Sequence, residues 1–487
     1  MSMQESWECI IGLEIHAQLN TKTKLFSRTP NRFGEEPNTN VGLTDTGQPG
    51  TLPVLNKAAV YKAVLLGCAL HSTIPSFSAF DRKSYFYPDS PRNFQITQFF
   101  HPIIRGGFIS ATVDDTVKTF TIKEAHLEDD AGMLKHFSTF AGVDYNRAGV
   151  PLIEIVSDPC IFSAKEAVAF ASAIRSLLIY LDISHGNMEE GSMRMDVNVS
   201  VRKKGEPGLR NKTEVKNLNS FSNMELAIEA EMQRQIDIYT KHPAADPKEV
   251  LPSTTMRFDP IAKQTIIMRS KVDAEDYRYF PEPDLPPLCI SKELIDTIKA
   301  SLPELPEQRK KRYMEKLELS AYNASLLVDD KSLSDYFEKG LASCKNPKAL
   351  CNWITVEFVG RLKDTGKHLL SLQLPCEHIS SLVNLIEDKT ITGKIAKLIA
   401  DEMVANPSRS PQEIIKSNPD FLPLSDPAQV EKIIDEVLSK NGQSVQDYKQ
   451  GVAKAFHYLI GQIMQVSKGK ASPDLVKELL LKKLSSY

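Results

Sequence analysis

The sequence lacks the features that mark several large classes of protein. Its seven cysteines are scattered and form no C-x-x-C pair, so neither a disulfide framework nor a structural zinc site is indicated. No apolar run approaches the roughly 18 residues that a membrane span needs. The N-terminus has no basic segment followed by an apolar core. We therefore expect a soluble cytoplasmic protein that does not bind a membrane.

The usual signatures of nucleotide-binding and nucleophilic enzymes are also missing. There is no G-x-x-x-x-G-K-[ST] loop, no G-x-G-x-x-G after a strand and no G-x-S-x-G turn. The formal net charge of -3 provides no global basic field for nucleic acid, so any RNA contact must use a local patch. If the chain is an enzyme, we expect metal-assisted chemistry on carboxylates and phosphates.

The 487 residues divide into three predicted domains by pattern. Residues 1–292 are strand-rich with Gly, Pro and Asn punctuation, residues 293–408 are mostly helical, and residues 409–487 form a short helical tail. We predict an α+β fold in which a large antiparallel or mixed β-sheet is followed by a helical domain and a small helical tail domain.

The stretch Gly12-Leu-Glu-Ile-His16 is predicted to be a β-strand. Side chains alternate along a strand, so Glu14 and His16 share one face and Leu13 and Ile15 share the other. An acid beside an imidazole can hold a divalent cation or act as an acid/base pair. The two residues can equally form a simple ion pair on a solvated face.

Further carboxylates lie in two other segments. Glu154 is the single carboxylate of the apolar stretch Val150-Pro-Leu-Ile-Glu-Ile-Val156. An unpaired buried carboxylate is very costly, so Glu154 needs a cation, a metal or an edge position. Three acids in a row, Glu128 to Asp130, precede a Gly turn. They offer hard oxygen ligands to Mg²⁺ or belong to a solvated loop.

Two segments mix cations with other polar groups along one face. Residues 193–202 alternate, and Arg194 and Asp196 lie on the polar side. These side chains could bind a phosphate and its metal ion. A half-exposed antiparallel strand gives the same alternation without any such role. Glu214 and Lys216 share a face in the same way.

Two candidate contacts with larger ligands remain. Asp81-Arg-Lys-Ser-Tyr-Phe-Tyr87 brings two cations beside three aromatics, either to hold a triphosphate and stack a base or as a plain surface loop. Residues 441–487 carry seven lysines against three acids, a local charge of +4. Such lysines usually cover a solvated helix face, and they can also contact an RNA backbone.

Seven motifs occur in a fixed order between residues 12 and 284, and the tail motifs Tyr448-Lys-Gln-Gly451 and Lys468-Gly-Lys-Ala471 extend the match nearly to the end of the chain. Together they closely resemble the family of B subunits of the glutamyl-tRNA(Gln)/aspartyl-tRNA(Asn) amidotransferases. The motifs are Gly12-Leu-Glu-Ile-His16, Arg82-Lys-Ser-Tyr-Phe-Tyr-Pro-Asp89, His126-Leu-Glu-Asp-Asp-Ala-Gly132, Tyr145-Asn-Arg-Ala-Gly-Val-Pro-Leu-Ile-Glu-Ile155, Gly191-Ser-Met-Arg-Met-Asp196, Glu214-Val-Lys-Asn-Leu-Asn-Ser-Phe221 and Asp276-Tyr-Arg-Tyr-Phe-Pro-Glu-Pro-Asp284.

The resemblance implies a glutamine-hydrolysing aminoacyl-tRNA amidotransferase, a carbon–nitrogen ligase that works as a heterotrimer. An A subunit releases ammonia from glutamine, and a small C subunit ties A and B together. The B subunit binds the misacylated tRNA. With ATP and Mg²⁺, the B subunit phosphorylates the side-chain carboxylate of Glu-tRNA(Gln) or Asp-tRNA(Asn). Ammonia then converts the product to Gln-tRNA(Gln) or Asn-tRNA(Asn). The family fold is an open cradle of β-sheet followed by a helical domain and a small helical tail.

The resemblance also assigns residues to roles. The metal ligands carried over from the family are His16, Glu128 and Glu154. The catalytic pocket would further contain Glu14, Lys83, Arg194, Asp196 and Lys216. The nucleotide-binding residues would be Lys83, Tyr85 and Arg194. The expected tRNA contacts in the tail are Lys454, Lys468 and Lys470.

One departure from the family pattern concerns zinc. Many members carry four cysteines that form a zinc site in the first strand region. The matching positions here are Ser27, Thr29, Gly42 and Asp45. We therefore predict that the chain binds no zinc.

Two other functions compete with this assignment. A non-catalytic tRNA-binding scaffold of the same complex would tolerate a degraded metal cluster, whereas His16, Glu128 and Glu154 are all present. A stand-alone ATP-dependent carboxylate–amine ligase would need its own nucleotide-binding signature and no basic tail, and neither condition is met.

Overall fold

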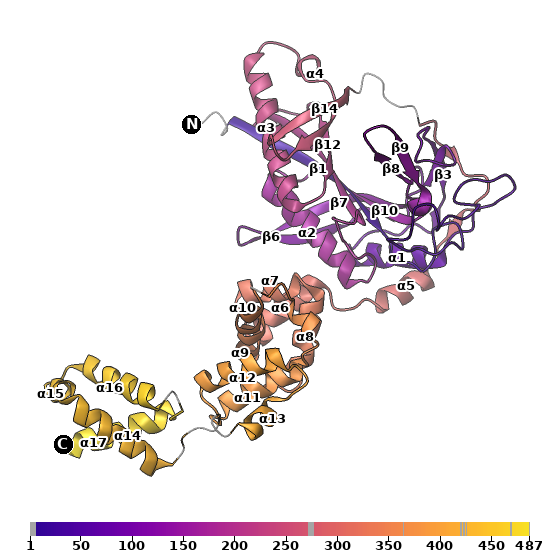
Figure 1. Cartoon of the computed structure of the whole chain (residues 1–487). Helices are drawn as coiled ribbons and strands as arrows, with labels where there is room; N and C mark the ends of the chain where they lie inside the picture. The colour runs from indigo at the N-terminus through magenta and orange to yellow at the C-terminus, as the bar shows by residue number, and fades with distance from the viewer. Residues whose placement is uncertain are drawn as a thin grey trace. The chain divides into compact units, whose positions relative to one another are not determined.

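The computed structural model describes residues 6–270, 277–363, 365–418, 421, 424, 426–467 and 470–486. The chain forms two compact units, Met1–Glu307 and Gln308–Tyr487 (Figure 1). The first unit combines a large sheet with helices and the second is helical, which confirms the predicted α+β class. The division into three domains at residues 292 and 408 stays a prediction.

A nine-stranded sheet, counted over the described residues, forms the frame of the first unit. Its order is β14-β13-β12-β11-β1-β10-β7-β5, and β6 pairs with β7. Neighbouring strands are antiparallel except β12 and β13, which are parallel. The strands are β1 (Trp7–Gln18), β5 (Ile104–Arg105), β6 (Phe108–Val113), β7 (Thr116–Asp129), β10 (Pro151–Ser157), β11 (Met193–Lys203), β12 (Thr213–Leu218), β13 (Thr254–Asp259) and β14 (Gln264–Ser270).

The most N-terminal strand, β1, lies in the middle of this sheet between β10 and β11. Its alternation follows the prediction: Leu13 and Ile15 are fully buried in the core, and Glu14 and His16 lie on the other face. The core face is covered by helices that contact the sheet or its edge strands. The helices of this unit are α1 (Lys57–Ala69), α2 (Ala164–Tyr180), α3 (Phe221–Lys241), α4 (Pro247–Val250), α5 (Lys292–Ala300) and the 3₁₀ helix η2 (Tyr145–Arg147).

Within the part of the chain that the structure describes, three small sheets accompany the large one. Their strands are β2 (Phe77–Ser78), β3 (Asp81–Ser84), β4 (Phe94–Thr97), β8 (Met133–His136), β9 (Ala141–Asp144), β15 (Phe280–Pro281) and β16 (Leu288–Cys289). The pairings are β15-β3-β4, β16-β2 and β8-β9. The β15-β3 pair is reinforced by Arg82, which forms an ion pair with the buried Glu282 at 2.7 Å.

The second unit is built from helices that begin at α6 (Pro306–Lys316), which starts just before the division. The others are α7 (Ala321–Val328), α8 (Lys331–Leu341), α9 (Pro347–Asn352), the π helix η4 (Trp353–Phe358), α10 (Val359–Leu362), the 3₁₀ helix η5 (Leu369–Leu372), α11 (Cys376–Glu387), α12 (Gly393–Ala405), α13 (Pro411–Ser417), α14 (Pro427–Lys440), α15 (Gly442–Lys449), α16 (Ala453–Val466) and α17 (Pro473–Ser486). Its last helices share an apolar cluster that includes Ile434, Leu459 and Leu480.

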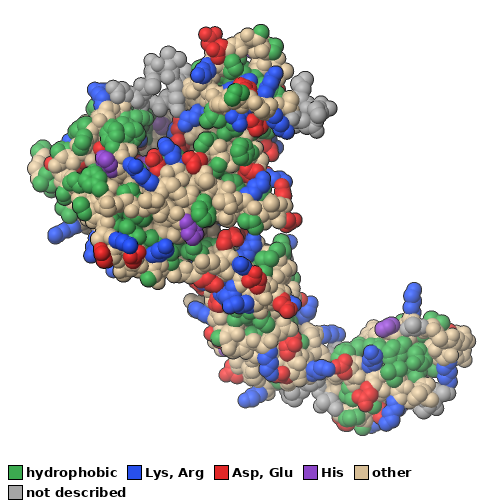
Figure 2. Space-filling view, turned by 180° about the vertical axis from the view of Figure 1, so that it is seen from behind, with side chains coloured by type: hydrophobic (Ala, Val, Ile, Leu, Met, Phe, Trp, Pro, Cys, Tyr) green, Lys and Arg blue, Asp and Glu red, His purple; other side chains and the backbone are tan. Residues whose placement is uncertain are grey.

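The surface carries mixed charge. On the face drawn in Figure 2, Lys and Arg side chains alternate with Asp and Glu over the helical unit. This pattern agrees with the small net charge and with the absence of a global basic field. Among the described residues, none of the helices combines the length and apolarity that a bilayer crossing requires.

Candidate functional site

Strand register brings four polar side chains into one row across the sheet. His16 on β1 lies opposite Arg194 on β11 and opposite Glu154 on β10. Glu154 in turn lies opposite His126 on β7. Directly opposed residues of antiparallel strands point to the same face, so the row lies on the side away from the helices.

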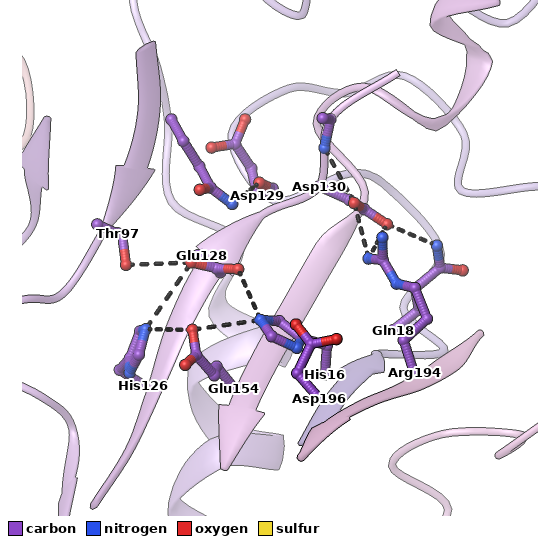
Figure 3. Close-up of polar contacts among 12 residues, drawn as sticks. His16, Gln18, Thr97, His126, Glu128, Asp129, Asp130, Glu154, Arg194 and Asp196 are labelled. Carbon is purple, nitrogen blue, oxygen red and sulfur yellow. Dashed lines mark hydrogen bonds and ion pairs between the residues drawn. The ribbon is translucent and has the colours of Figure 1, made fainter. Parts of the chain in front are cut away.

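The predicted metal ligands His16, Glu128 and Glu154 meet at this row (Figure 3). Their ligand atoms all lie within 4.8 Å of one another. His16 Nε2 is 3.3 Å from Glu154 Oε2 and 3.9 Å from Glu128 Oε1. Thr97 donates a hydrogen bond to Glu128 Oε2 at 3.3 Å. Two carboxylates and one imidazole are a donor set that holds a divalent cation.

His126 supports the same group from β7, although the sequence pattern alone assigned it no role. Its Nε2 is 3.2 Å from Glu154 Oε2 and 3.8 Å from Glu128 Oε2. Burial disfavours its charged form, yet the two carboxylates raise the pKa of His126 to about 10. Its Nδ1 is buried without a hydrogen-bond partner among the described residues. The alternation of His126-Leu-Glu128 was the signal that could have found it.

The two carboxylates are held ionised by these imidazoles. Burial alone would raise the pKa of Glu154, but His16 and His126 hold it well below its ordinary value. The pKa of Glu128 is also lowered against burial, through His126 and Lys83. Burial would lower the pKa of His16, and Glu154 raises it above its usual value. Because the raised pKa values favour protonated rings, a cation bound here would replace the proton of His16 between the two ionised carboxylates.

A second acidic group lies beside the first. The ligand oxygens of Glu14, Asp196 and Glu214 lie within 4.8 Å of one another. Lys216 enters this group, with Nζ 2.6 Å from Asp196 Oδ2 and 2.9 Å from Glu214 Oε1. Despite burial, these carboxylates raise the pKa of Lys216 above its ordinary value. Burial and the neighbouring Glu154 raise the pKa of Glu14.

An amide also contributes to the second group. Asn198 donates from Nδ2 to Glu14 Oε1 at 3.0 Å. Its Oδ1 is buried and has no hydrogen-bond partner among the described residues. This orphaned acceptor, together with the oxygens of the two acidic groups, fits the ligand chemistry of Mg²⁺. The sequence pattern places Glu214 beside Lys216 but does not predict its membership of the site, which the structure shows.

Most of the predicted pocket residues line one cavity of about 800 Å³ in the first unit. The lining includes His16, Lys83, Tyr85, Glu128, Arg194, Asp196 and Lys216. Lys83 lies on β3, and its ammonium group lies 4.9 Å from the ring centre of Tyr277, which also lines the cavity. Burial opposes the charge of Lys83, but Glu128 raises its pKa. The cavity lining therefore combines carboxylates with cationic side chains.

The three acidic residues before the Gly turn make different contacts. Glu128 joins the first group, while Asp130 accepts hydrogen bonds from Arg194 Nη2 with both oxygens at 2.8 Å. Asp129 forms an ion pair with Arg92 and accepts a hydrogen bond from the backbone of Ile96 at 2.9 Å. Asp129 and Asp130, two of the three expected oxygen ligands, therefore bind arginine side chains and a backbone N–H group instead. Arg194 is held in place beside the cavity.

The positions that match the family's zinc cysteines lie in a loop near the cavity. Gly42 donates its backbone N–H to Asp45 Oδ2 at 2.9 Å, and a Cβ at Gly42 would come within 2.2 Å of the hydroxyl of Thr29. The loop is crossed by Lys24, whose Nζ lies 3.1 Å from Asp45 Oδ2 and donates to the carbonyl of Asn40 at 3.0 Å. Both charged side chains are buried.

The predicted tRNA contacts lie in the second unit. Lys454 is on α16, and Lys470 precedes α17. Lys468 lies outside the described residues. Their contact with tRNA stays a prediction.

Two family models match the chain. Residues 9–296 match the model of the GatB/GatE catalytic domain, and residues 335–484 match that of the GatB domain. A protein of Protochlamydia amoebophila (strain UWE25), named as the B subunit of aspartyl/glutamyl-tRNA(Asn/Gln) amidotransferase, is 58% identical over 480 residues, covering 99% of this chain and 97% of the relative. Proteins of the same name from Chlamydia pneumoniae and Chlamydia abortus are 56% and 57% identical, each over 98% of both chains. The chain therefore belongs to the family of aspartyl/glutamyl-tRNA(Asn/Gln) amidotransferase B subunits.

Proposed function

We propose that this chain is the subunit of a tRNA-dependent amidotransferase that activates the side-chain carboxylate of Glu-tRNA(Gln), Asp-tRNA(Asn) or both. The partners would be an A subunit that hydrolyses glutamine and a C subunit, as a heterotrimer. The observation that carries the proposal is the meeting of His16, Glu128 and Glu154 on one sheet face, beside Lys83, in a cavity of about 800 Å³. The family membership of the whole chain supports the same reaction.

The chemistry requires activation before amidation. Ammonia cannot displace oxide from a carboxylate, because oxide is too poor a leaving group. A carboxylate oxygen therefore attacks the γ-phosphorus of ATP, and ADP leaves. Ammonia then attacks the carbonyl carbon of the acyl phosphate. The amide forms as phosphate departs with the original carboxylate oxygen.

Bringing a carboxylate to a triphosphate places two anions together, so positive charge must surround the transferring group. Mg²⁺ bound by His16, Glu128 and Glu154 would supply this neutralisation at the phosphates. Lys83 extends its ammonium group into the same cavity and would contact the transferring phosphoryl group. Arg194 would contact the nucleotide from a position fixed by Asp130.

The remaining residues would orient these groups. The two protonated imidazoles keep Glu128 and Glu154 ionised, and a cation bound by His16 would take over this charge as His16 releases its proton. Lys216 holds Asp196 beside Glu14, so this second acidic group could take a further cation or position the first. Tyr85 lines the cavity and would stack on the adenine of ATP.

The test is amidation of Glu-tRNA(Gln) by the chain co-expressed with its A and C partners. Ammonium chloride replaces glutamine, so the glutaminase is not needed, and ATP and Mg²⁺ are supplied or omitted. We expect Gln-tRNA(Gln) only when both are present, and we expect His16→Ala to remove it. If tRNA binds but no product forms, the chain is a non-catalytic scaffold and the catalytic assignments fail.

A further inference from the structure

A run of four aromatic rings leads outward from Lys83, and the proposed reaction does not use it. The run consists of Tyr277, Tyr279, Phe99 and Phe100. The ring of Tyr277 lies below the Lys83 ammonium group and 6.0 Å from the ring of Tyr279. Tyr279 stacks on Phe99 with 4.0 Å between ring centres and 10° between planes. Phe99 meets Phe100 edge to face at 5.0 Å.

The backbone holds these rings in fixed places. The buried carboxylate of Asp81 accepts hydrogen bonds from the N–H groups of Phe99 and Phe100, at 2.9 Å and 3.0 Å. The N–H of Ser84 donates to the carbonyl of Tyr277 at 2.9 Å. Two segments that lie far apart in the sequence are thereby fixed to β3, the strand that carries Lys83. The surface is built into the fold.

The outer half of the run is open to solvent. Phe99 is 52% exposed and Phe100 is 49% exposed. Folding gains little from large rings left half in water, and adjacent exposed aromatics typically mark an interaction surface. Arg105, an exposed residue of β5, donates from Nη2 to the carbonyl of Phe100 at 3.1 Å. The run therefore has a cation at each end, Lys83 inside and Arg105 outside.

The position of the run identifies the ligand chemistry. The reacting carboxylate belongs to an amino acid esterified to the 3′ end of a tRNA, and that amino acid is only one residue long. When the carboxylate reaches the cavity beside Lys83, the terminal nucleotides must therefore lie at the cavity mouth. These nucleotides are unpaired, so their bases offer free faces for stacking on aromatic rings. Arg105 at the outer end of the run suits the phosphates that join these nucleotides.

We propose that Tyr277, Tyr279, Phe99 and Phe100 form a stacking surface for the unpaired 3′-terminal nucleotides of the aminoacyl-tRNA. This inference rests on the proposed function, because it needs the tRNA-linked carboxylate in the cavity. The adenine of ATP is a different ligand, assigned to Tyr85, and of the four rings of the run Tyr277 lines the same cavity as Tyr85. The surface binds the substrate through base faces and is expected to show little sequence preference.

The experiment measures binding without turnover, on the complex with its partner subunits. The probes are intact tRNA(Gln) and the same tRNA with its terminal unpaired nucleotides removed. Wild type is compared with the double variant Phe99→Ala/Phe100→Ala. Both of these side chains are half exposed. Phe162→Ala is the matched control, since Phe162 is equally exposed, at 52%, and is not part of the aromatic run. Phe99→Trp preserves a stacking ring.

We expect the double variant to weaken the Kd of intact tRNA by about 5- to 100-fold. Removing the terminal nucleotides from the tRNA should weaken its binding to the wild-type complex by a similar factor. The same removal should not weaken binding to the double variant. Phe162→Ala and Phe99→Trp should bind like wild type. In the separate amidation assay, the KM for ATP should not change.

Three results would overturn the inference. The first is an unchanged Kd for intact tRNA in the double variant. The second is a double substitution that weakens the binding of intact and truncated tRNA by the same factor. The third is loss of a partner protein on size-exclusion chromatography, which would make the surface a protein interface. Because binding is measured without ATP, these failures leave the amidation test standing, and a failure of amidation leaves the binding comparison interpretable.

Discussion

The buried pair Lys24–Asp45 allows a sharp prediction about stability. Both side chains are essentially removed from solvent, and their charged atoms are 3.1 Å apart. Replacing Lys24 by Met removes the cation and leaves the Asp45 carboxylate buried beside the backbone N–H of Gly42, which donates to it at 2.9 Å. Breaking a buried pair by removing one partner costs about 3–5 kcal/mol, because the remaining charge is uncompensated.

The size of the unit converts this free energy into a melting temperature. The first unit spans 307 residues. Unfolding entropy of about 2.1 cal/mol/K per residue gives roughly 0.6 kcal/mol/K for the unit, so the melting temperature should fall by about 5–8 °C. The double variant Lys24→Met/Asp45→Asn removes both charges and keeps an acceptor for Gly42. It should recover most of the loss, to within about 2 kcal/mol of wild type.

Differential scanning calorimetry of the full chain measures both effects in the transition of the first unit. Lys165→Met is the control, since Lys165 forms an exposed pair with Asp114 at 3.0 Å and its loss should leave that transition unchanged. A Lys24→Met variant that melts like wild type would refute the reasoning. A double variant no more stable than the single one would refute it as well.

Three further predictions concern charge at the site and in the loop. Glu154→Gln should lower ATP-dependent amidation by at least about 100-fold while the tRNA Kd stays near wild type, and a parallel loss of folding by circular dichroism would make Glu154 structural instead. Lys216→Met leaves Asp196 and Glu214 without their ammonium partner, so its melting temperature should rise more with added Mg²⁺ than that of wild type; an equal rise in both would contradict this role. Burial lowers the pKa of Lys24 from 10.5, so between the lowered pKa and 10.5 the unfolded chain binds more protons and wild-type stability rises with pH. Denaturant unfolding over that pH range should show a smaller rise of the unfolding free energy with pH in Lys24→Met/Asp45→Asn than in wild type. An identical rise in both proteins would contradict the lowered pKa of Lys24.

Local pattern was enough to place individual strands and their faces. Alternation put Glu14 and His16 on the face opposite to Leu13 and Ile15, and β1 shows this arrangement. The same rule places Glu214 and Lys216 together, and they meet in the structure at 2.9 Å. Strand periodicity is a local property, so one sequence suffices to read it.

The convergence of the strands could not be read in the same way. His16 faces Glu154 and Arg194 because β1 pairs with strands more than a hundred residues away in the sequence. No local pattern encodes which strands become neighbours. The roles of Asp129 and Asp130 escaped for a related reason, since each is paired with a distant arginine, Arg92 or Arg194.

Oxygen-isotope transfer tests the central claim most directly. Glu-tRNA(Gln) with ¹⁸O in its side-chain carboxylate is amidated by the complex with ammonium chloride, ATP and Mg²⁺, and the released phosphate is analysed by mass spectrometry. We predict that each turnover moves one ¹⁸O atom into phosphate, and that His16→Ala abolishes the labelled phosphate. Amide product accompanied by unlabelled phosphate would show that the carboxylate is not phosphorylated and would contradict the proposed activation step.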